Sequence, residues 1–288
     1  MDSFMTHPAL TPGSVAVVTG AAAGIGFAAA LRFAKLGLNV CLADIDVDQL
    51  SRAAKQVAAV ASGGESQVIY QQTDVAEVED LQRLEQVVRD RFGGTDVLMN
   101  NAGIQPGSTV FGPVENWHRV LGVNLWGVVH GVQAFVPSMI RRGRPGCVIN
   151  TGSKQGITTP PGDPAYNVSK VGVKACTEAL QHELRNTSSC QISAHLLIPG
   201  FVFTQLTAQG RAERPAAAWT PEQTVDFMME RLDAGDFYIL CPDNDVPRSL
   251  DEKRILWAAG DIVENRPPLS RWLPEYQEAF QSFSRALE

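Results

Sequence analysis

Cysteine is scarce in this 288-residue sequence, and its five cysteines are widely dispersed. They form no C-x-x-C pair and are odd in number, which argues against a disulfide framework and against a zinc site. Cys41 and Cys147 fall in predicted strands, where cysteine usually serves as a small buried hydrophobic residue. We therefore expect a reducing, cytoplasmic environment and no bound metal.

Positive charge and long apolar runs are also lacking. The sequence has 24 Lys and Arg residues against 31 Asp and Glu, a formal net charge of −7, which argues against a nucleic-acid partner. Its one short basic run, residues 141–144, follows a predicted helix end, where cations interact favourably with the helix dipole. No run reaches the apolar length that crosses a bilayer, and residues 1–13 have no apolar core typical of a signal peptide. We therefore expect no membrane partner.

A glycine-rich turn stands near the start of the chain. Residues 19–26 read TGAAAGIG, after an apolar run over residues 15–18 and before an Ala-rich segment, 27–35, with good helix propensity. Glycines allow close approach to a pyrophosphate, and the free N–H groups of a helix start attract it. From Gly24 the window also reads G-x-G-x-x-A, a dinucleotide-binding pattern. A phosphate site is predicted here, with a simple glycine-rich turn as the alternative.

Apolar runs of strand length alternate with amphipathic segments of helix length along most of the chain. Further strands are predicted over residues 39–43, 67–71, 96–99, 147–150, 192–198 and 237–240, and helices from 46 and over 78–92, 117–139 and 166–184. This alternation predicts an α/β fold, a Rossmann-type doubly wound parallel sheet of seven strands flanked by helices. We expect a single domain over residues 1–288, with a core of about 14–242 and a C-terminal extension, 243–288.

In such sheets, ligands bind beyond the carboxyl ends of the strands. Polar residues of interest stand at these points: Gly20, Asp44, Asp74, Asn101, Ser153 and Thr204. Asp44 comes about twenty residues after the glycine turn, where a carboxylate can accept hydrogen bonds from both ribose hydroxyls. A 2′-phosphate would meet like charge there, because Ala23 and Ile45 are not basic and Arg32 lies two turns into the helix. The sequence therefore predicts NAD rather than NADP.

Tyr166 and Lys170 lie four residues apart on one face of a predicted helix. A tyrosine of ordinary pKa is a poor acid or base at neutral pH, and a nearby cation lowers that pKa towards the working range. Ser153, just past the fifth strand, is expected at the same sheet edge, where its hydroxyl can hold a substrate oxygen while Tyr166 exchanges a proton with it. A surface Tyr–Lys pair is the alternative.

Asn124 lies inside an apolar segment, where we expect it to be buried. A buried Asn side chain must find hydrogen-bond partners. Two roles are open, and they are compatible. The side chain braces a helix kink, or the residue supports a water-mediated proton relay to Lys170.

These residues occur together in one known pattern. The sequence resembles the short-chain dehydrogenase/reductases through landmarks that run in family order between about Ser14 and Pro242. They are Thr19-Gly20-x-x-x-Gly24-x-Gly26, Asn100-Asn101-Ala102-Gly103, Asn124, Ser153, Tyr166-x-x-x-Lys170 and Pro199-Gly200-x-Val202-x-Thr204. The resemblance implies a Rossmann fold and hydride transfer between a nicotinamide and a substrate carbonyl or alcohol.

The resemblance also implies residue roles. Tyr166 would be the general acid/base, Lys170 would lower its pKa and bind the nicotinamide ribose, Ser153 would polarise the substrate oxygen, and Asn124 would support the relay. Asp74 would contact the adenine. The implied cofactor-binding residues are Gly20, Gly24, Ile25, Gly26, Asp44, Asp74, Val75, Asn101, Tyr166, Lys170, Val202 and Thr204, the last two holding the carboxamide.

The residues expected around the substrate are less informative than the motifs above. They predict a bulky, largely apolar secondary alcohol or its ketone as the substrate. The expected walls are apolar: Ile104, Ile157, Pro160, Pro161, Phe201, Phe203 and Trp219. The only cations of the lid segment, 204–218, are Arg211 and Arg214, and anionic substrates usually need such a clamp. In the extension, Trp257 and Trp272 either cover this pocket or pack on the sheet edge near residues 237–240.

An NAD-dependent alcohol dehydrogenase or ketone reductase is the leading interpretation. A catalytically silent NAD-binding regulator and an isomerase or dehydratase on the same scaffold are the alternatives. The long segments 117–139 and 166–184 are apolar beyond one covered face, and the second is rich in small residues. The family's four-helix contact would make the protein a homodimer or homotetramer. Packing of both helices on the sheet is the competing account.

Overall fold

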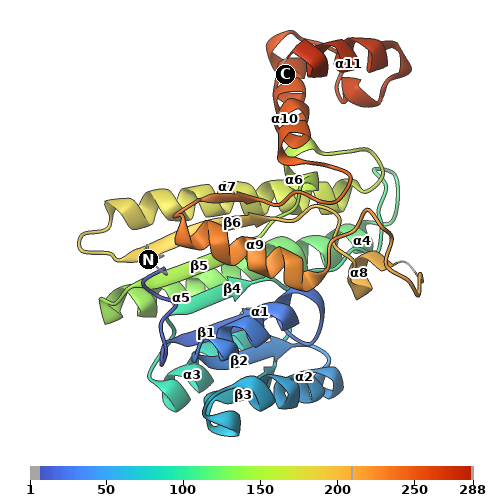
Figure 1. The fold of residues 1–288 in the computed structure, drawn as a ribbon. Helices are drawn as coiled ribbons and strands as arrows, with labels where there is room; N and C mark the ends of the chain where they lie inside the picture. The colour runs from blue at the N-terminus through green and yellow to red at the C-terminus, as the bar shows by residue number, and fades with distance from the viewer. Residues whose placement is uncertain (1–6, 209, 287–288) are drawn as a thin grey trace, which may run out of the picture.

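Seven parallel strands form one sheet, in the order β3-β2-β1-β4-β5-β6-β7 (Figure 1). The structure is a computed structural model that describes residues 7–208 and 210–286. The strands are β1 (Val15–Thr19), β2 (Asn39–Asp44), β3 (Val68–Gln72), β4 (Val97–Asn100), β5 (Gly146–Thr151), β6 (Ile192–Ile198) and β7 (Tyr238–Leu240). The order reverses between β1 and β4, which is the switch point of a doubly wound sheet. The predicted fold class is confirmed.

Helices cover both faces of the sheet. On one face lie α1 (Gly24–Lys35), α2 (Val47–Val60) and α9 (Pro221–Asp233), and on the other α3 (Val78–Phe92), α5 (Gly127–Arg142) and α7 (Pro164–Asn186). Ala16 and Val18 of β1 point into the first layer, Val15 and Val17 into the second. Because both faces are buried, the strands read as continuous apolar runs rather than as alternating ones.

Local sequence signals set several helix ends. Asp46 caps α2 by accepting a hydrogen bond from Gln49 N at 3.0 Å. Gly93 and Gly143 end α3 and α5 in the left-handed conformation, with φ of 81° and 60°. The predicted helix over 78–92 therefore has the observed bounds of α3.

The predicted helix over 117–139 is instead three connected pieces. α4 (Val114–Leu121) runs into the π-helical turn η2 (Gly122–Trp126) and then into α5. By length and composition alone, the continuous run Val114–Arg142 is a candidate to cross a membrane, contrary to the expectation from sequence. Core helices of folded domains meet the same criterion, and α5 packs beside α3 and β4 in this fold.

The C-terminal extension forms a small helical unit of its own. In Figure 1, α10 (Arg248–Val263) rises from the body beside α6 (Gln155–Thr158), with α11 (Gln277–Ala286) at its far end. The remaining short helices are η1 (Gly64–Gln67), α8 (Gln205–Ala208), η3 (Ser270–Trp272) and η4 (Pro274–Tyr276).

Trp257 forms the core of this extension. Its ring packs edge-on against Phe280 and Phe283, 5.4 and 5.3 Å between centroids, and its indole N–H donates to Ser270 Oγ at 2.8 Å. Only the base of α10 reaches the sheet edge, where Ile255 joins the cluster that contains Leu240 and Ile157. Within this chain, neither Trp257 nor Trp272 lines the cavity described below, and the extension packs on the sheet edge near Leu240 through Ile255.

Candidate active site

One cavity of about 380 Å³ opens at the carboxyl edge of the sheet. The loops after β1, β2, β4, β5 and β6 converge on it, as expected for ligand sites in such sheets. The cavity brings together ten of the predicted site residues: Gly20, Gly24, Ile25, Asp44, Asn101, Ser153, Tyr166, Lys170, Val202 and Thr204.

Two positions of the glycine turn between β1 and α1 have no room for a side chain. Gly20 has φ of +63°, and a Cβ there would lie 2.8 Å from Ala102 Cα. A Cβ on Gly26 would lie 2.3 Å from the Gly20 carbonyl oxygen. Gly26 itself does not line the cavity. Its lack of a side chain lets α1 begin close to the turn, so that the start of the helix faces the cavity.

Asn101 braces this turn from the neighbouring strand. Its amide Nδ2 donates to the Thr19 and Gly20 carbonyl oxygens at 3.1 and 3.3 Å, and its backbone N–H donates to Thr19 Oγ1 at 2.9 Å. Its Oδ1 accepts from Thr151 Oγ1 at 3.3 Å. One side chain thus ties the ends of β1, β4 and β5 together.

Carboxylates line the end of the cavity next to β2. Asp44 Oδ2 accepts a hydrogen bond from Ala22 N at 3.0 Å, and Oδ1 accepts one from Asp46 N at 3.2 Å. Asp46 and Gln49, at the start of α2, also line the cavity. From the sequence, only a helix start is predicted at residue 46, although the place of Asp46 two residues after Asp44 was a usable signal.

Asp74 and Val75 are not among the residues that line the cavity. Asp74 Oδ1 accepts from Ala76 N at 2.9 Å, which starts the turn into α3. Val75 is buried, and a Cβ on Gly127 would lie 2.7 Å from its side chain. Their predicted contact with a cofactor remains a prediction.

Tyr166 and Lys170 are both buried at the inner end of the cavity. Burial raises the pKa of Tyr166 to about 12, although a hydrogen bond with the Ser153 side chain lowers it. Burial lowers the pKa of Lys170 to about 8. Lys170 Nζ donates to the Thr151 carbonyl oxygen at 2.8 Å and lies 5.7 Å from the centre of the Tyr166 ring. Lys170 is not among the groups that shift the pKa of Tyr166, on which burial has the largest effect, so the predicted lowering by Lys170 is not seen.

Asn124 lies in the π-helical turn and is fully buried. Its Oδ1 accepts from Ile104 N at 2.8 Å, and its Nδ2 donates to the Ile104 carbonyl oxygen at 2.9 Å and to Ser169 Oγ at 3.3 Å. These bonds join the π-helical turn to the Ile104 loop and to α7, and the bracing of a helix kink stays a prediction. The part of Asn124 in a proton relay also stays a prediction.

Several residues that line the cavity were not predicted individually from the sequence. They are Ala22, Ala23, Asp46, Gln49, Ala102, Gly103, Thr151, Gly152, Pro199, Gly200, Gln205, Leu206 and Thr207. Most of them are neighbours of the motif residues, so their backbone faces the same space. The sequence motifs marked these loops, but not which backbone atoms face inward.

The expected substrate walls do not line this cavity. Trp219 packs against Phe227, 5.8 Å between ring centroids, and Ile157 belongs to the cluster at the base of α10. In the lid segment, Arg214 donates to the Ala218 carbonyl oxygen. Of the described residues in that segment, those that line the cavity are Thr204 and three residues of the short helix α8, Gln205, Leu206 and Thr207.

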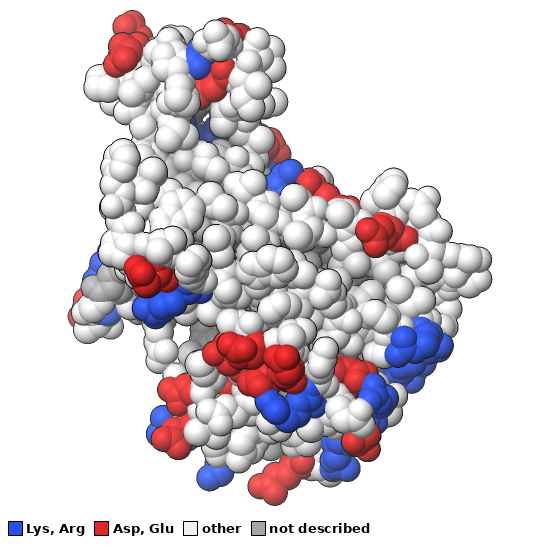
Figure 2. Space-filling view, turned by 180° about the vertical axis from the view of Figure 1, so that it is seen from behind, with Lys and Arg blue, Asp and Glu red and all other residues white. Residues whose placement is uncertain are grey.

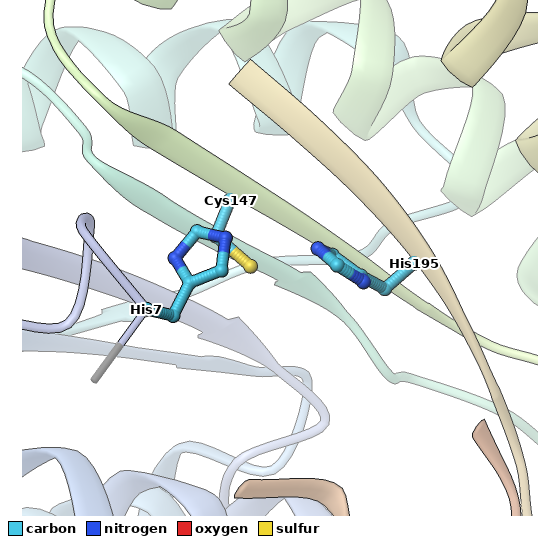
Figure 3. Close-up of side chains that lie close together, drawn as sticks. All are labelled: His7, Cys147 and His195. Atoms are coloured by element: carbon cyan, nitrogen blue, oxygen red, sulfur yellow. The ribbon is translucent and has the colours of Figure 1, made fainter. Parts of the chain in front are cut away.

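A second polar cluster lies at the amino edge of the sheet. His7, Cys147 and His195 place ligand-type atoms within 4.8 Å of one another, with the two rings on either side of the sulfur (Figure 3). Burial lowers the pKa of His7 to about 4 and also lowers that of His195, so both are neutral at pH 7.

Hydrogen bonds assign the protons of this cluster. His7 Nδ1 accepts from Ala9 N at 3.2 Å, so its Nε2 carries the proton and donates to Ser193 Oγ at 2.9 Å. Ser193 then donates to His195 Nε2 at 2.8 Å, and His195 Nδ1 donates to the Asp236 carbonyl oxygen at 2.8 Å. A metal on His7 Nε2 would displace that proton to Nδ1, against the N–H of Ala9, so the cluster fits a hydrogen-bonded chain.

The fold and the carboxyl-edge cavity define a nucleotide-binding oxidoreductase: a doubly wound sheet, a glycine turn at a helix start, and a buried Tyr–Lys pair beside a serine. A family model described as short chain dehydrogenase matches residues 14–215. The chain therefore belongs to the short-chain dehydrogenase/reductase family, and the resemblance noted from its motifs is confirmed.

Relatives extend this similarity over most of the chain. The 1-deoxy-11-beta-hydroxypentalenate dehydrogenase of Streptomyces exfoliatus is 33% identical over 265 residues, which cover 89% of this chain and 93% of that protein. A short-chain dehydrogenase/reductase from Burkholderia phymatum, solved in complex with NAD, has a TM-score of 0.79 at 31% identity and covers 89% and 96% of the two chains.

An alcohol dehydrogenase from the archaeon Thermococcus sibiricus, complexed with 5-hydroxy-NADP, has a TM-score of 0.67 at 28% identity. The match covers 75% of this chain and 88% of that one. The solved structures thus include both cofactor types. With the family and these dehydrogenases, the chain is an oxidoreductase that acts on hydroxyl or keto substrates.

Proposed function

We propose that this chain is an NAD-dependent dehydrogenase or ketone reductase whose acid/base group is Tyr166. One observation carries the proposal: Asp44, Ser153, Tyr166 and Lys170 line one continuous cavity. A cofactor that extends from Asp44 to Lys170 would place its reactive end beside the only phenol that lines the cavity. Bound there, NAD supplies the acceptor or donor of a hydride.

Each protein group has a defined task. Ser153 holds the substrate oxygen, and Tyr166, its hydrogen-bond partner, exchanges the proton with that oxygen. A phenol of raised pKa is protonated at neutral pH, which suits proton donation to a carbonyl. Lys170, held by Thr151, adds positive charge next to the phenol and reaches the cofactor ribose. Asn124 keeps the Ile104 loop in place and contributes to the relay.

NAD fits the cavity better than NADP. Asp44 and Asp46 both line the β2 end, and Lys170, at the other end, is the only lysine or arginine among the lining residues. A 2′-phosphate would bring added negative charge to two carboxylates without a cation to offset it. Hydrogen bonds from Ala22 and Asp46 hold the Asp44 carboxylate in place to accept the ribose hydroxyls.

A bulky, largely apolar secondary alcohol or its ketone is the proposed substrate. Among the described residues that line the cavity, Lys170 is the only cation that could bind a carboxylate. Leu206 and Ile25 add apolar surface, and Leu206 is itself partly exposed on α8. This part of the proposal does not rest on Trp219 or Ile157, which pack elsewhere.

We also propose a homodimer or homotetramer in the cytoplasm. Val168, Val171, Ala175 and Ala179 form an exposed apolar stripe along α7 at helical spacing. Trp126 is 53% exposed on η2, which contacts α7. Gly172 is not part of this stripe, because Leu125 of the same chain packs on it. Light scattering that finds a monomer at micromolar concentration would contradict this proposal.

Neither a nucleic acid nor a membrane is a proposed partner. Figure 2 shows acidic and basic side chains interspersed on the rear face, with few of either across its middle. Such a surface offers no continuous positive stripe to a phosphate backbone.

The testing experiment is a screen of purified protein with NAD against a panel of secondary alcohols, read by NADH absorbance. We expect turnover with apolar alcohols, and weaker turnover with polyols and anionic hydroxy acids. Tight NAD binding without turnover on any member would favour the silent regulator. Conversion of a substrate with no net NADH would favour an isomerase or dehydratase.

A further inference from the structure

Lys154 directly follows Ser153 and is the centre of a buried ion cluster outside the cavity. Its Nζ lies 3.2 Å from Asp243 Oδ2 and 2.5 Å from Asp251 Oδ2. The two carboxylate side chains are only 7% and 6% exposed. Asp243 follows β7, and Asp251 lies in the first turn of α10, so both come from the chain beyond the predicted core.

The same cluster contacts the backbone that lines the cavity. The Lys154 backbone N–H donates to the Pro199 carbonyl oxygen at 3.2 Å, and Asp243 Oδ2 accepts from Phe201 N at 3.3 Å. Between them, a Cβ on Gly200 would lie 2.6 Å from Asp243 Oδ2 and 2.8 Å from Lys154 Nζ. Lys154 and Asp243 therefore pack directly on the Pro199–Phe201 segment, whose first two residues line the cavity.

The charges around Lys154 make its position sensitive to α10. Asp251 Oδ1 lies 3.8 Å from Arg254 of the same helix, and Arg271 lines the small cavity that Lys154, Asp251 and Arg254 share. When one member of a buried ion cluster is removed, its partners keep uncompensated charge and must move or gain water. An exposed pair such as Lys174–Glu178, whose side chains are 36% and 34% exposed, has no such effect.

We infer that Lys154 is a positioning residue that couples the C-terminal extension to the catalytic centre. Asp251 of α10 and Asp243 fix the Lys154 ammonium, and the Lys154 backbone in turn fixes the adjacent Ser153 and the Pro199–Phe201 segment. The extension is thereby part of the active-site scaffold, although its aromatic residues do not reach the cavity. This inference rests on the proposed function of Ser153.

Asp251→Asn is the first test, because it removes charge and keeps the shape of the side chain. We expect kcat to fall about tenfold, with a smaller change in KM, since a displacement of about 1 Å of a catalytic group costs up to about a hundredfold. Lys154→Met should lower kcat at least as much, and Lys154→Arg should restore part of it. Lys174→Met is the matched control, with kcat expected to be unchanged.

The double variant decides whether the effect passes through Lys154. In a Lys154→Met background, Asp251→Asn should cause no further loss of kcat, because the group that it acts on is gone. Losses that multiply, or an unchanged kcat in both single variants, would overturn the inference. If Lys154→Met does not fold, the same cycle is run with Lys154→Gln, which also removes the charge. A wild-type protein without turnover would instead contradict the proposed function, which keeps the two failures apart.

Discussion

Buried polar groups of similar kind lie at both edges of the sheet, but their surroundings differ. At the amino edge, each ring nitrogen of His7 and His195 has a hydrogen-bond partner, and the chain ends on a backbone carbonyl. At the carboxyl edge, Tyr166 and Lys170 are buried beside an open cavity. Burial raises the pKa of Tyr166 and lowers that of Lys170, as it lowers that of His7 at the amino edge, so the two edges differ in access to a cavity. Groups with shifted pKa values that lie in a cleft are candidates for a functional site.

This difference shows that a cluster of reactive side chains needs adjoining open space before it can serve as a ligand site. At the amino edge, hydrogen bonds engage the ring nitrogens of both His7 and His195. The carboxyl edge keeps a phenol, an ammonium and a hydroxyl next to space that a substrate can enter. Variants at the two edges should therefore separate activity from stability.

Tyr166→Phe should give the largest effect on activity. General acid/base groups typically contribute about a hundredfold to ten-thousandfold, so kcat should fall by that range while NAD binding and the unfolding midpoint stay close to wild type. Steady-state kinetics with an active alcohol and cofactor titration measure both. A kcat near wild type would remove Tyr166 from the mechanism.

Lys170→Met should inactivate the enzyme and make it more stable at neutral pH. The folded pKa of about 8 lies below the ordinary value of 10.5, so the unfolded chain binds more protons between these values. Below pH 8, the buried charge lowers the free energy of unfolding by at most about 3 kcal/mol. This loss is relieved as the pH rises to 10.5. Urea unfolding at pH 7 and pH 10 measures it, with Lys174→Met as control. A less stable variant at pH 7 would contradict this account.

Ser193→Ala should act only on stability. The substitution leaves His7 Nε2–H and His195 Nε2 without their shared partner, which costs about 1–3 kcal/mol for a buried polar group. We expect a lower unfolding midpoint with kcat and KM unchanged. A clear loss of kcat in the folded variant would mean that the amino edge also serves catalysis.

Asp44→Ala should narrow the preference for NAD over NADP, by about tenfold in the ratio of kcat/KM, because one of two carboxylates that repel a 2′-phosphate is gone. Asp46→Ala, two residues away, should have a smaller effect. The ratio is measured with both cofactors at one alcohol concentration. Wild-type protein that uses NADP as well as NAD would contradict the assignment itself.

Much of the fold and the core of the site could be predicted from the sequence. The helix over 78–92 and the strand over 192–198 have the observed bounds, because hydrophobic periodicity and end signals agree there. The glycine turn, Ser153, Tyr166 and Lys170 meet at one cavity, because the carboxyl ends of parallel strands share an edge.

Features that depend on distant residues could not be predicted. The π-helical turn at Asn124 depends on Ile104 and Ser169, and the ion cluster joins Lys154 to residues about ninety positions later. The place of Trp257 depends on α11, which the sequence reading did not assign as a helix. Neither composition nor spacing encodes such pairings.

The most direct test of the central claim follows the hydrogen on the carbinol carbon. Purified protein is incubated with NAD and an active secondary alcohol that carries deuterium on that carbon, and the reduced cofactor is examined by mass spectrometry. The account predicts deuterium in the NADH, and it predicts that the labelled NADH forms about a hundredfold to ten-thousandfold more slowly when Tyr166→Phe replaces the wild type. Consumption of the alcohol with no deuterium in the NADH would contradict it.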